Sequence, residues 1–391
     1  HSEPSLVTYG FDESMVHLDT DFAHHMKDDG KVIMMNDRYI KVEYVNLKND
    51  DGTPQVDVFN LDDVDRNSAK AKYIRNKMIL NKSLKVKEGK LLPKDAVVAY
   101  NEAFYQEMGG DIIFKAGPIA YVAITSSQNC YEDSTTVTES LAKRLSSRTL
   151  KRVEVKLKPD YRIASVRDFG SIQPGDVLIK YAEDLGGAFA SNKIDVDLLD
   201  DILMKTKKCN YEGSLKEIYV YTHLTEKEES ELDPSIKKFI ASVQKHYDSY
   251  DTNALAQGLP GYEKNRTLEH VTHFKGNRKA KMNGSTIYAG EIMIEFYIDT
   301  EMRFTGGDKV TFGASALKGV CNSVIPTEDA PIGSKTGRRI DAILSTNSPL
   351  ARMVMSFFFT GVLNECAIKA NNDIRKIVGL EEKKYAGQDE K

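Results

Sequence analysis

Short runs of alternating apolar and polar residues recur along the chain and predict a β-rich protein. The clearest are KVIMMNDRYIKVEYVN at 31–46, KRVEVKLK at 151–158 and EIMIEFYI at 291–298. Turn signals separate such runs. NDDGTP at 49–54 joins the first run to VDVF in a predicted hairpin, and QPGD at 173–176 is a second turn. The pattern therefore predicts hairpins and ribbons over most of the chain.

The 3.6-residue period of a helix is clearest over residues 225–250. Thr225 and Glu228 have the spacing of a capping box, in which each side chain caps the other residue's backbone N–H. Asp233 followed by Pro234 is a second helix start, because Asp is a good N-cap and Pro suits the first helical position. We expect an amphipathic packing helix here.

Three other segments also have helical features. A long helix is expected from about 350 to 378, with Gly379 as the residue that ends it. Another helical stretch is expected around 195–207, before the strand EIYVYTHL at 217–224. The segment TTVTESLAKRL at 135–145 fits a short helix or a strand, and its pattern does not decide between them.

Composition places the chain among globular proteins. It has 391 residues, of which 41% are hydrophobic and 29% charged, so it resembles neither disordered nor fibrous chains. The net charge, 54 − 58 = −4, gives no global basic surface for nucleic acid, although local ones remain open. Residues 251–290 are polar and locally basic, and fit either a solvated face or a nucleic-acid-facing loop. Four distant cysteines predict free thiols in a reducing compartment. No signal-like stretch opens the chain and the most apolar segment, 350–363, is too short to span a bilayer, so we expect a soluble, intracellular type of protein.

Familiar catalytic motifs are absent, so candidate chemistry rests on single charged residues. The sequence has no Walker A loop, GxGxxG, HExxH or GxSxG motif. Lys309 and Lys318 stand beside glycine-rich turns, where a lysine can approach a phosphate closely. Arg352 is expected at the start of a helix, a favourable place for an arginine that binds a triphosphate. Glu132 and Asp133 follow a strand, and one of them could contact a phosphate-bound metal through water.

The order of these motifs resembles the C-terminal half of the β subunit of multisubunit RNA polymerases. The family reads GDK, then NKGV, NP-x-EDMP, VDI-x-LNP and PSRMN. The present chain reads GDKVTFGASALKGV at 307–320, IPTEDAP at 325–331 and IDAILSTNSPLARMV at 340–354. Upstream, AYVAITSSQNCYEDST at 120–135 is similar to VAFMPWNGYNFEDSI, and DVFNLDDVDRNSAK at 57–70 to DIYNLTKYTRSNQNT. The heavy divergence resembles the split polymerases of large tailed phages.

The resemblance implies roles for single residues. Lys309 and Lys318 match the two active-centre lysines that contact the RNA 3′ end and nearby phosphates. Arg352 matches the arginine that contacts the triphosphate of the incoming nucleotide, and Glu132 and Asp133 match the acidic pair near the second Mg²⁺. Lys309, Lys318 and Arg352 form the expected catalytic set, and Glu132 and Asp133 are expected to help bind NTP and its Mg²⁺.

Two further features of the resemblance bear on nucleic acid. Arg66 and Asn67 match part of the fork region beside downstream DNA and the RNA–DNA hybrid. The loop between the two lysines departs from the family, because it is one residue longer. It has Phe312 to Ala316 where the family has an arginine and a histidine. Lys318 is therefore aligned from its KGV side.

The implied activity is nucleotidyl transfer by a DNA-directed RNA polymerase, which this chain would not perform alone. The family binds its catalytic Mg²⁺ mainly through an NADFDGD loop on β′, and this sequence has no such loop. The implied partners are an N-terminal β fragment, β′-like fragments, template DNA, nascent RNA, NTPs and a promoter-specificity factor, without a membrane. The implied location is the cytoplasm of an infected bacterial host, with packaging in the virion as an alternative.

The expected fold is a β-rich α+β chain with a double-psi β-barrel, an inserted flap-like β module and a C-terminal helical segment. The division that follows has a β-rich, fork-proximal region at 1–84 and a discontinuous barrel at 85–135 and 290–345. The flap-like module and a helical insertion take 136–289, and the helix and tail take 346–391.

Two alternatives remain open. A single-chain two-barrel RNA-dependent polymerase would need the acidic triad that this sequence lacks. A β-rich phage structural or nucleic-acid-binding module with a degenerate barrel would have no need to keep Lys309, Lys318 and Arg352.

Overall fold

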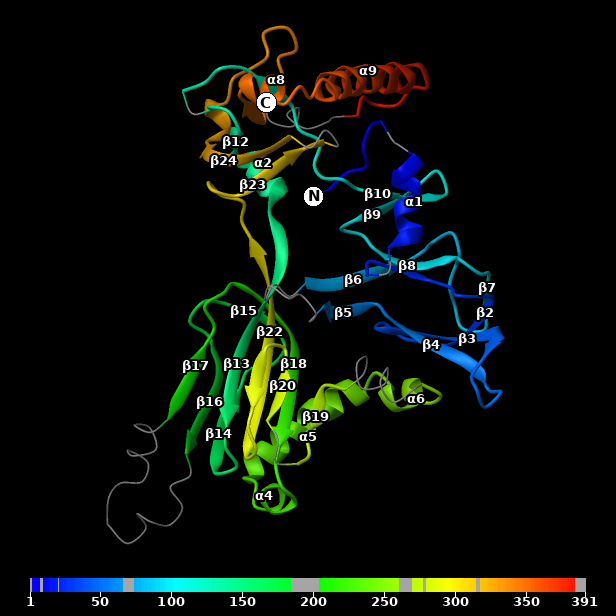
Figure 1. Ribbon diagram of the computed structural model, residues 1–391, viewed down its shortest axis with the longest axis vertical. Coiled ribbons are helices and arrows are strands. Elements are labelled where there is room, and N and C mark those ends of the chain that lie inside the picture. The colour runs from blue at the N-terminus through cyan, green and yellow to red at the C-terminus, as the bar shows by residue number, and fades with distance from the viewer. Residues whose placement is uncertain are drawn as a thin grey trace.

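The computed structural model describes residues 2–7, 10–19, 21–65, 74–128, 130–183, 204–259, 269–276, 279–313 and 317–383. The chain is a β-rich α+β protein with a curled, half-barrel sheet and a long C-terminal helix. Its strands gather in three parts (Figure 1): an N-terminal region, a central module of long strands, and an end sheet beside the C-terminal helix.

The N-terminal region contains two four-stranded sheets, β4-β3-β2-β7 and β1-β8-β6-β5. The first sheet consists of β2 (Gly30–Met35), β3 (Tyr39–Lys48), β4 (Pro54–Asn60) and β7 (Leu91–Leu92). The second consists of β1 (Ala23–His25), β5 (Asp62–Asp65), β6 (Ile74–Leu80) and β8 (Val97–Asn101). Helix α1 (Gly10–Leu18) and the hairpin of β9 (Tyr105–Met108) and β10 (Asp111–Phe114) complete the region. The hairpin predicted around 49–54 is confirmed, because β3 pairs with β4 across that turn.

The central module is built on three long strands, β13 (Ser147–Leu157), β18 (Gly213–His223) and β22 (Glu291–Met302). Strand β22 lies between the other two and pairs antiparallel with both. Short strands β15 (Gly170–Ile172) and β19 (Val271–His273) both pair with β18. A second sheet consists of β14 (Tyr161–Val166), β16 (Val177–Glu183) and β17 (Lys205–Lys208). A small hairpin joins β20 (Ala280–Met282) to β21 (Ser285–Ile287). Because β22 pairs with β13 as far as Met302, residues 291–302 belong to this sheet by their hydrogen bonds.

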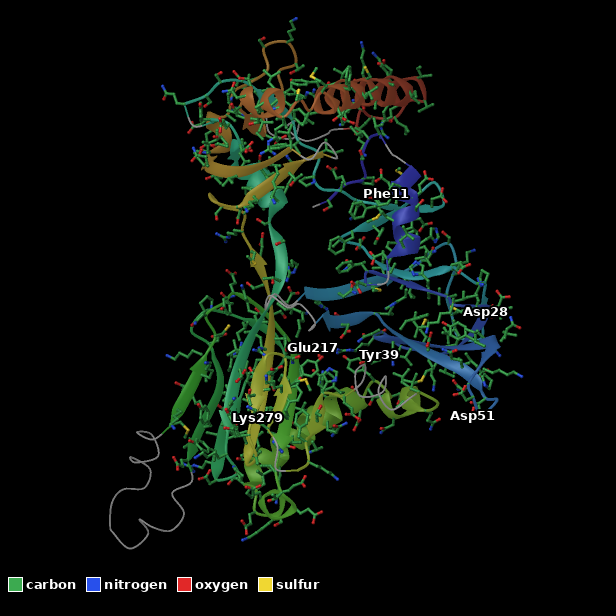
Figure 2. The ribbon with its side chains drawn as sticks, in the orientation of Figure 1. Phe11, Asp28, Tyr39, Asp51, Glu217 and Lys279 are labelled. Atoms are coloured by element: carbon green, nitrogen blue, oxygen red, sulfur yellow. The ribbon has the colours of Figure 1, made fainter. Side chains whose placement is uncertain are left out.

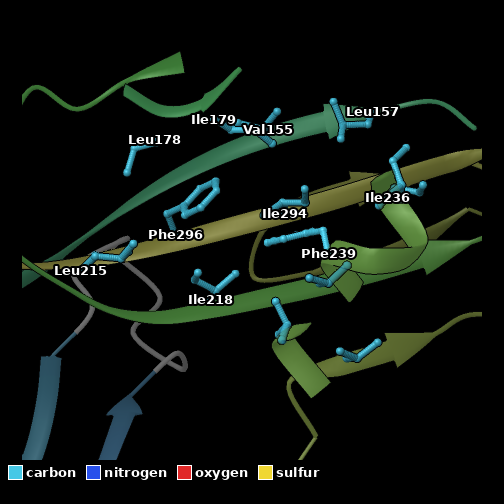
Figure 3. Packing of buried hydrophobic residues seen from close by; sticks show 14 of the residues in the cluster. Val155, Leu157, Leu178, Ile179, Leu215, Ile218, Ile236, Phe239, Ile294 and Phe296 are labelled. Carbon is cyan, nitrogen blue, oxygen red and sulfur yellow. The ribbon is translucent and has the colours of Figure 1, made fainter. Parts of the chain in front are cut away.

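The helices predicted in the central module are confirmed at residues 225–250. Thr225 and Glu228 form the expected capping box at the start of α4 (Glu226–Ser230). Asp233 caps α5 (Pro234–Asp248), which is followed by the short α6 (Thr252–Ala256). Figure 3 shows α5 lying over the sheet, with Ile236 and Phe239 packed against strand residues such as Ile294 and Phe296. This cluster is the largest of the hydrophobic cores.

The prediction of a helix around 195–207 is wrong for the residues of that range that the structure describes. Residues 205–208 form strand β17, which pairs with β16, and residues 195–203 lie outside the described residues. The segment KTKK has no apolar side chain to bury, so pairing with the edge of β16 decides its conformation.

Buried polar groups join the N-terminal region to the central module. Arg38 donates to Glu217 with an Nη2–Oε1 distance of 2.6 Å, and both side chains are less than a tenth exposed. Glu217 also accepts from the Tyr247 hydroxyl at 2.8 Å and lies 3.1 Å from His270 Nε2. Figure 2 shows Glu217 and Tyr39 close together where the two parts meet. His270, which lies in the polar segment 251–290 expected to be a solvated face or a nucleic-acid-facing loop, is a buried member of this contact.

The end sheet has the strand order β11-β25-β12-β24-β23. Its members are β11 (Val122–Ile124), β12 (Ser134–Thr138), β23 (Lys309–Phe312), β24 (Leu317–Ile325) and β25 (Ala342–Leu344). Two pairs, β11 with β25 and β12 with β24, are parallel, so segments about 200 residues apart in the chain lie side by side. The segment 135–145, left open between strand and helix, is both: β12 runs directly into α2 (Glu139–Leu145).

The C-terminal helix begins later than expected. A short helix α8 (Asn347–Ala351) ends at Arg352, and the long helix α9 (Ser356–Ile377) starts only after a break. Met353 has φ +51°, a left-handed conformation that a continuous right-handed helix cannot contain. The end of the helix is as predicted: Gly379 has φ +75°, and Leu380 N–H bonds to the Arg375 carbonyl in a Schellman arrangement.

Two simpler findings complete the description. All four cysteines are free, as expected, and three of them are buried. Among the described residues, no helix is both long enough and apolar enough to cross a membrane.

Candidate functional site

Lys309 and Lys318 lie on the same face of one β-hairpin. Strands β23 and β24 pair antiparallel, with Lys309 opposite Val320 and Lys318 opposite Thr311. Residues in this diagonal relation are about 7–8 Å apart in antiparallel sheets. Both lysines are exposed, whereas Val310 and Phe312, on the other face of β23, are buried in the core of the end sheet. The hairpin therefore presents two ammonium groups on one side.

Asp133 meets this hairpin through its backbone. Its carbonyl oxygen accepts a hydrogen bond from Val320 N–H at 2.8 Å, at the point where β12 begins to pair with β24. Gly319 makes this approach possible, because a Cβ atom at that position would be only 2.6 Å from the same oxygen. The glycine of the KGV motif is thus required by packing, and it lets the Asp133 carbonyl lie against Gly319 and Val320.

Glu132 is held in a tight turn before β12. It has φ +45°, which is uncommon for a residue other than glycine. Its carbonyl oxygen accepts a short hydrogen bond from the Ser348 hydroxyl, and Ser348 is buried in α8. The turn is therefore tied to α8 on one side and to β24 on the other.

Arg352 and Asp133 form an ion pair, with a distance of 2.6 Å between Nη2 and Oδ2. Their side chains remain 40% and 48% exposed. Arg352 does not begin a helix, as the sequence suggested, but is the C-cap of α8. The prediction that Arg352 lies at a helix N-terminus is therefore wrong. Its position comes instead from the turn between α8 and α9 and from Asp133.

A buried carboxylate supports the sheet beneath these groups, and the sequence analysis missed it. Asp341 is almost fully buried and accepts hydrogen bonds from Arg144 at 2.8 Å and from the backbone N–H of Tyr121 at 2.8 Å. These contacts join α2, the segment before β11 and the segment before β25. An aspartate directly before the apolar run AIL was the one available signal, because a charged residue next to a buried strand needs partners.

The remaining predicted residues are divided between described and undescribed parts of the chain. Arg66 and Asn67, together with residues 314–316 of the loop between the lysines, lie outside the described residues. Glu132 and Asp133 are both exposed carboxylates and are neighbours in one turn. Within the described ranges, no group of three or more His, Cys, Asp or Glu side chains is placed to hold a metal ion.

Backbone pairing links four predicted residues, Lys309, Lys318, Asp133 and Arg352: the Asp133 carbonyl oxygen bonds to Val320 N–H, Val320 lies opposite Lys309, and Asp133 pairs with Arg352. Three of them are cationic and exposed, and the fourth holds the arginine by an ion pair that water reaches. Such a surface suits an anion with several phosphate groups. No protein-family model matches this chain, and no curated protein was found to match it.

Proposed function

We propose that this chain is a β-like subunit of a DNA-dependent RNA polymerase, corresponding to the C-terminal part of a split β subunit of the phage type. It would supply the cationic residues that bind the RNA 3′ end and the phosphates of the incoming NTP. The observation that carries the proposal is the shared face of Lys309 and Lys318, beside the Arg352–Asp133 pair. The ordered motifs predict these residues for one site, and the backbone bond from Val320 to Asp133 links the hairpin to the ion pair.

The two lysines suit an RNA terminus better than a small ligand. They project from adjacent strands in a diagonal pair, so two ammonium groups on one face are available to successive phosphates of one strand. Phosphoryl transfer needs positioning and charge neutralisation more than covalent help from the protein. The buried face of the hairpin, with Val310 and Phe312, fixes the backbone from which the two flexible lysine side chains extend.

Arg352 suits the triphosphate because its present partner is easily exchanged. An exposed ion pair contributes little to stability, since water screens both charges. A triphosphate carries more charge than one carboxylate and accepts the guanidinium in a bidentate manner. We propose that Asp133 keeps the guanidinium in place until NTP binds, and that Arg352 then turns to the phosphates.

Mg²⁺ would come mainly from a partner chain. Oxygen ligands are those that Mg²⁺ prefers, and it usually keeps several waters, so Glu132 and Asp133 fit a contact through water. Bound Mg²⁺ supplies neutralisation of the phosphate charge. The other partners of the proposal are an N-terminal β fragment, β′-like fragments, template DNA, nascent RNA and a promoter-specificity factor. The proposed location is the cytoplasm of an infected host.

The finer fold also belongs to this proposal. We propose that the end sheet is part of a double-psi β-barrel and that the central module is flap-like. Support comes from the interleaved order of β11, β12, β24 and β25, in which two parallel pairs join distant segments. Since β22 pairs with β13, the second barrel segment would start after Met302.

The experiment is single-nucleotide extension of an RNA primer by the assembled polymerase. Lys309→Ala and Lys318→Ala should each lower the extension rate about tenfold or more, because a charge-assisted phosphate contact contributes about 1.5–3 kcal/mol. Lys82→Ala, at an exposed lysine of the N-terminal region, is the matched control and should leave the rate unchanged. Extension at the wild-type rate by both site variants would refute the proposal.

A further inference from the structure

Helix α8 contacts the turn before β12 at two points. The hydroxyl of Ser348 donates a hydrogen bond to the carbonyl oxygen of Glu132, and the guanidinium of Arg352 donates to the carboxylate of Asp133. The two donors are four residues apart, and residues at this spacing lie on the same face of a helix, one turn from each other. One face of α8 therefore binds two consecutive residues of the turn.

The two contacts differ in their access to water. Ser348 is only 2% exposed, whereas the side chains of Arg352 and Asp133 are 40% and 48% exposed. A buried hydroxyl has no water to take the place of its acceptor, so its hydrogen bond stays closed. Water reaches both partners of the ion pair, so that contact can open at little cost. The helix is thus held by one permanent contact and one exchangeable contact.

The backbone next to each partner of the ion pair has an uncommon conformation. Glu132, which precedes Asp133, has φ +45°, and Met353, which follows Arg352, has φ +51°. Left-handed conformations cost free energy in residues other than glycine, and they persist only where surrounding contacts hold them. The Ser348 hydroxyl supplies such a contact at the carbonyl group of Glu132. It therefore supports the turn that presents the carboxylate as well as the helix that presents the guanidinium.

We propose that Ser348 is a positioning residue for Arg352. It anchors α8 on the turn at Glu132, so that the guanidinium can leave Asp133 for the phosphates of the NTP while the helix stays in place. The motif resemblance gives Ser348 no role, and its place in the site comes from its hydrogen bond and its burial. This inference rests on the proposed function and deepens it, because the binding of triphosphate by Arg352 belongs to that proposal.

Loss of the anchor should weaken NTP binding without slowing the chemical step. Without the Ser348 hydroxyl, the ion pair between Arg352 and Asp133 carries more of the attachment of α8 to the turn. Opening that pair for NTP then costs more free energy, and a loosened helix places the guanidinium less well. Both effects weaken binding of the ground state and of the transition state alike, which raises the NTP concentration needed and leaves the saturating rate unchanged.

The test is the NTP-concentration dependence of single-nucleotide addition by the assembled polymerase carrying Ser348→Ala. The apparent NTP affinity should fall about threefold to tenfold, the range that one neutral hydrogen bond contributes to an equilibrium, with the saturating rate near the wild-type value. Ser323→Ala is the matched control, because it removes a hydroxyl that lies 3.1 Å from the Thr136 hydroxyl and joins β24 to β12 of the same sheet. It should keep the wild-type NTP dependence.

A double variant separates positioning from a purely structural role. If Ser348 acts through Arg352, Ser348→Ala/Arg352→Ala should have the same apparent NTP affinity as Arg352→Ala alone. The inference is overturned by a wild-type NTP dependence of Ser348→Ala, an equal fall in Ser323→Ala, a saturating rate that falls with the affinity, or a further fall in the double variant. A wild-type NTP dependence of Arg352→Ala would instead remove the triphosphate role on which the inference rests, so the two failures are distinguishable.

Discussion

Two arginine–carboxylate pairs of equal length serve different purposes in this molecule. Arg38–Glu217 and Arg352–Asp133 both have an N–O distance of 2.6 Å. The first pair is 8% and 5% exposed, and the second is 40% and 48% exposed. The first joins two parts of the fold, and the second joins the turn before β12 to the end of α8. Length alone therefore says little about what an ion pair does.

Burial makes the difference. Glu217 has lost its water, and Arg38, Tyr247 and His270 replace it, so removing any one of them leaves a buried charge poorly compensated. Asp133 and Arg352 can each return to water at little cost. A pair that must stay closed is a structural joint, while a pair that can open is suited to exchange one anion for another.

The largest effect is expected from breaking the buried pair. Arg38→Ala should lower the free energy of unfolding by about 3–5 kcal/mol, because Glu217 would stay buried without its cation. Urea denaturation measures the change. The double variant Arg38→Ala/Glu217→Ala should lose less than the two single variants together, since the residues are coupled. If the losses in the free energy of unfolding of the two single variants simply add up in the double variant, the two residues are not energetically coupled.

Acid should weaken the same joint. Burial by itself would raise the pKa of Glu217, but the His270 hydrogen bond and the Arg38 charge outweigh burial and lower the pKa to about 2. The stabilisation from this group is therefore complete above its ordinary pKa near 4.5 and is lost as pH falls from there toward 2. The loss is about 3 kcal/mol. The free energy of unfolding, measured by urea denaturation at several pH values from about 6 to 3, should fall more steeply with falling pH in the wild type than in Glu217→Gln. An identical pH dependence in the two proteins would contradict the assignment.

A smaller effect is expected at the backbone contact beneath the exposed pair. Gly319→Ala would push a Cβ atom to 2.6 Å from the Asp133 carbonyl oxygen, so β12 and β24 must shift. We expect a loss of about 1–3 kcal/mol in thermal or urea unfolding. Gly361→Ala in α9, where a Cβ atom meets nothing within 4 Å, is the control and should be neutral or slightly stabilising. Equal effects at both glycines would argue against a special contact at Gly319.

The smallest effect on stability is expected from the exposed pair itself. Arg352→Ala should change the free energy of unfolding by less than about 1 kcal/mol. Arg167→Ala, which removes another exposed pair with Asp176, should behave alike. A loss of several kcal/mol at Arg352 alone would remove the contrast between the two kinds of pair.

Local features of the fold could be read from the sequence because neighbouring residues determine them. The capping box of Thr225 and Glu228 and the N-cap at Asp233 depend on spacing over a few residues, and both are confirmed. The end of α9 at Gly379 is a further example.

Features that depend on distant partners could not be read in the same way. Nothing near Arg38 indicates Glu217, 179 residues away, and nothing near β12 indicates its parallel pairing with β24. The break between α8 and α9 was missed because the apolar pattern continues through it, while the Asp133 contact and the left-handed Met353 interrupt the helix. Motif order assigned Asp133 and Arg352 to one site, but nothing in the sequence indicated that they form an ion pair.

The most direct test of the central claim is the NTP-concentration dependence of single-nucleotide addition by the assembled polymerase carrying Arg352→Ala. If Arg352 exchanges Asp133 for the triphosphate, the apparent NTP affinity should fall about tenfold or more, while Arg167→Ala should leave it at the wild-type value. An Arg352→Ala polymerase with the wild-type NTP dependence would contradict the account.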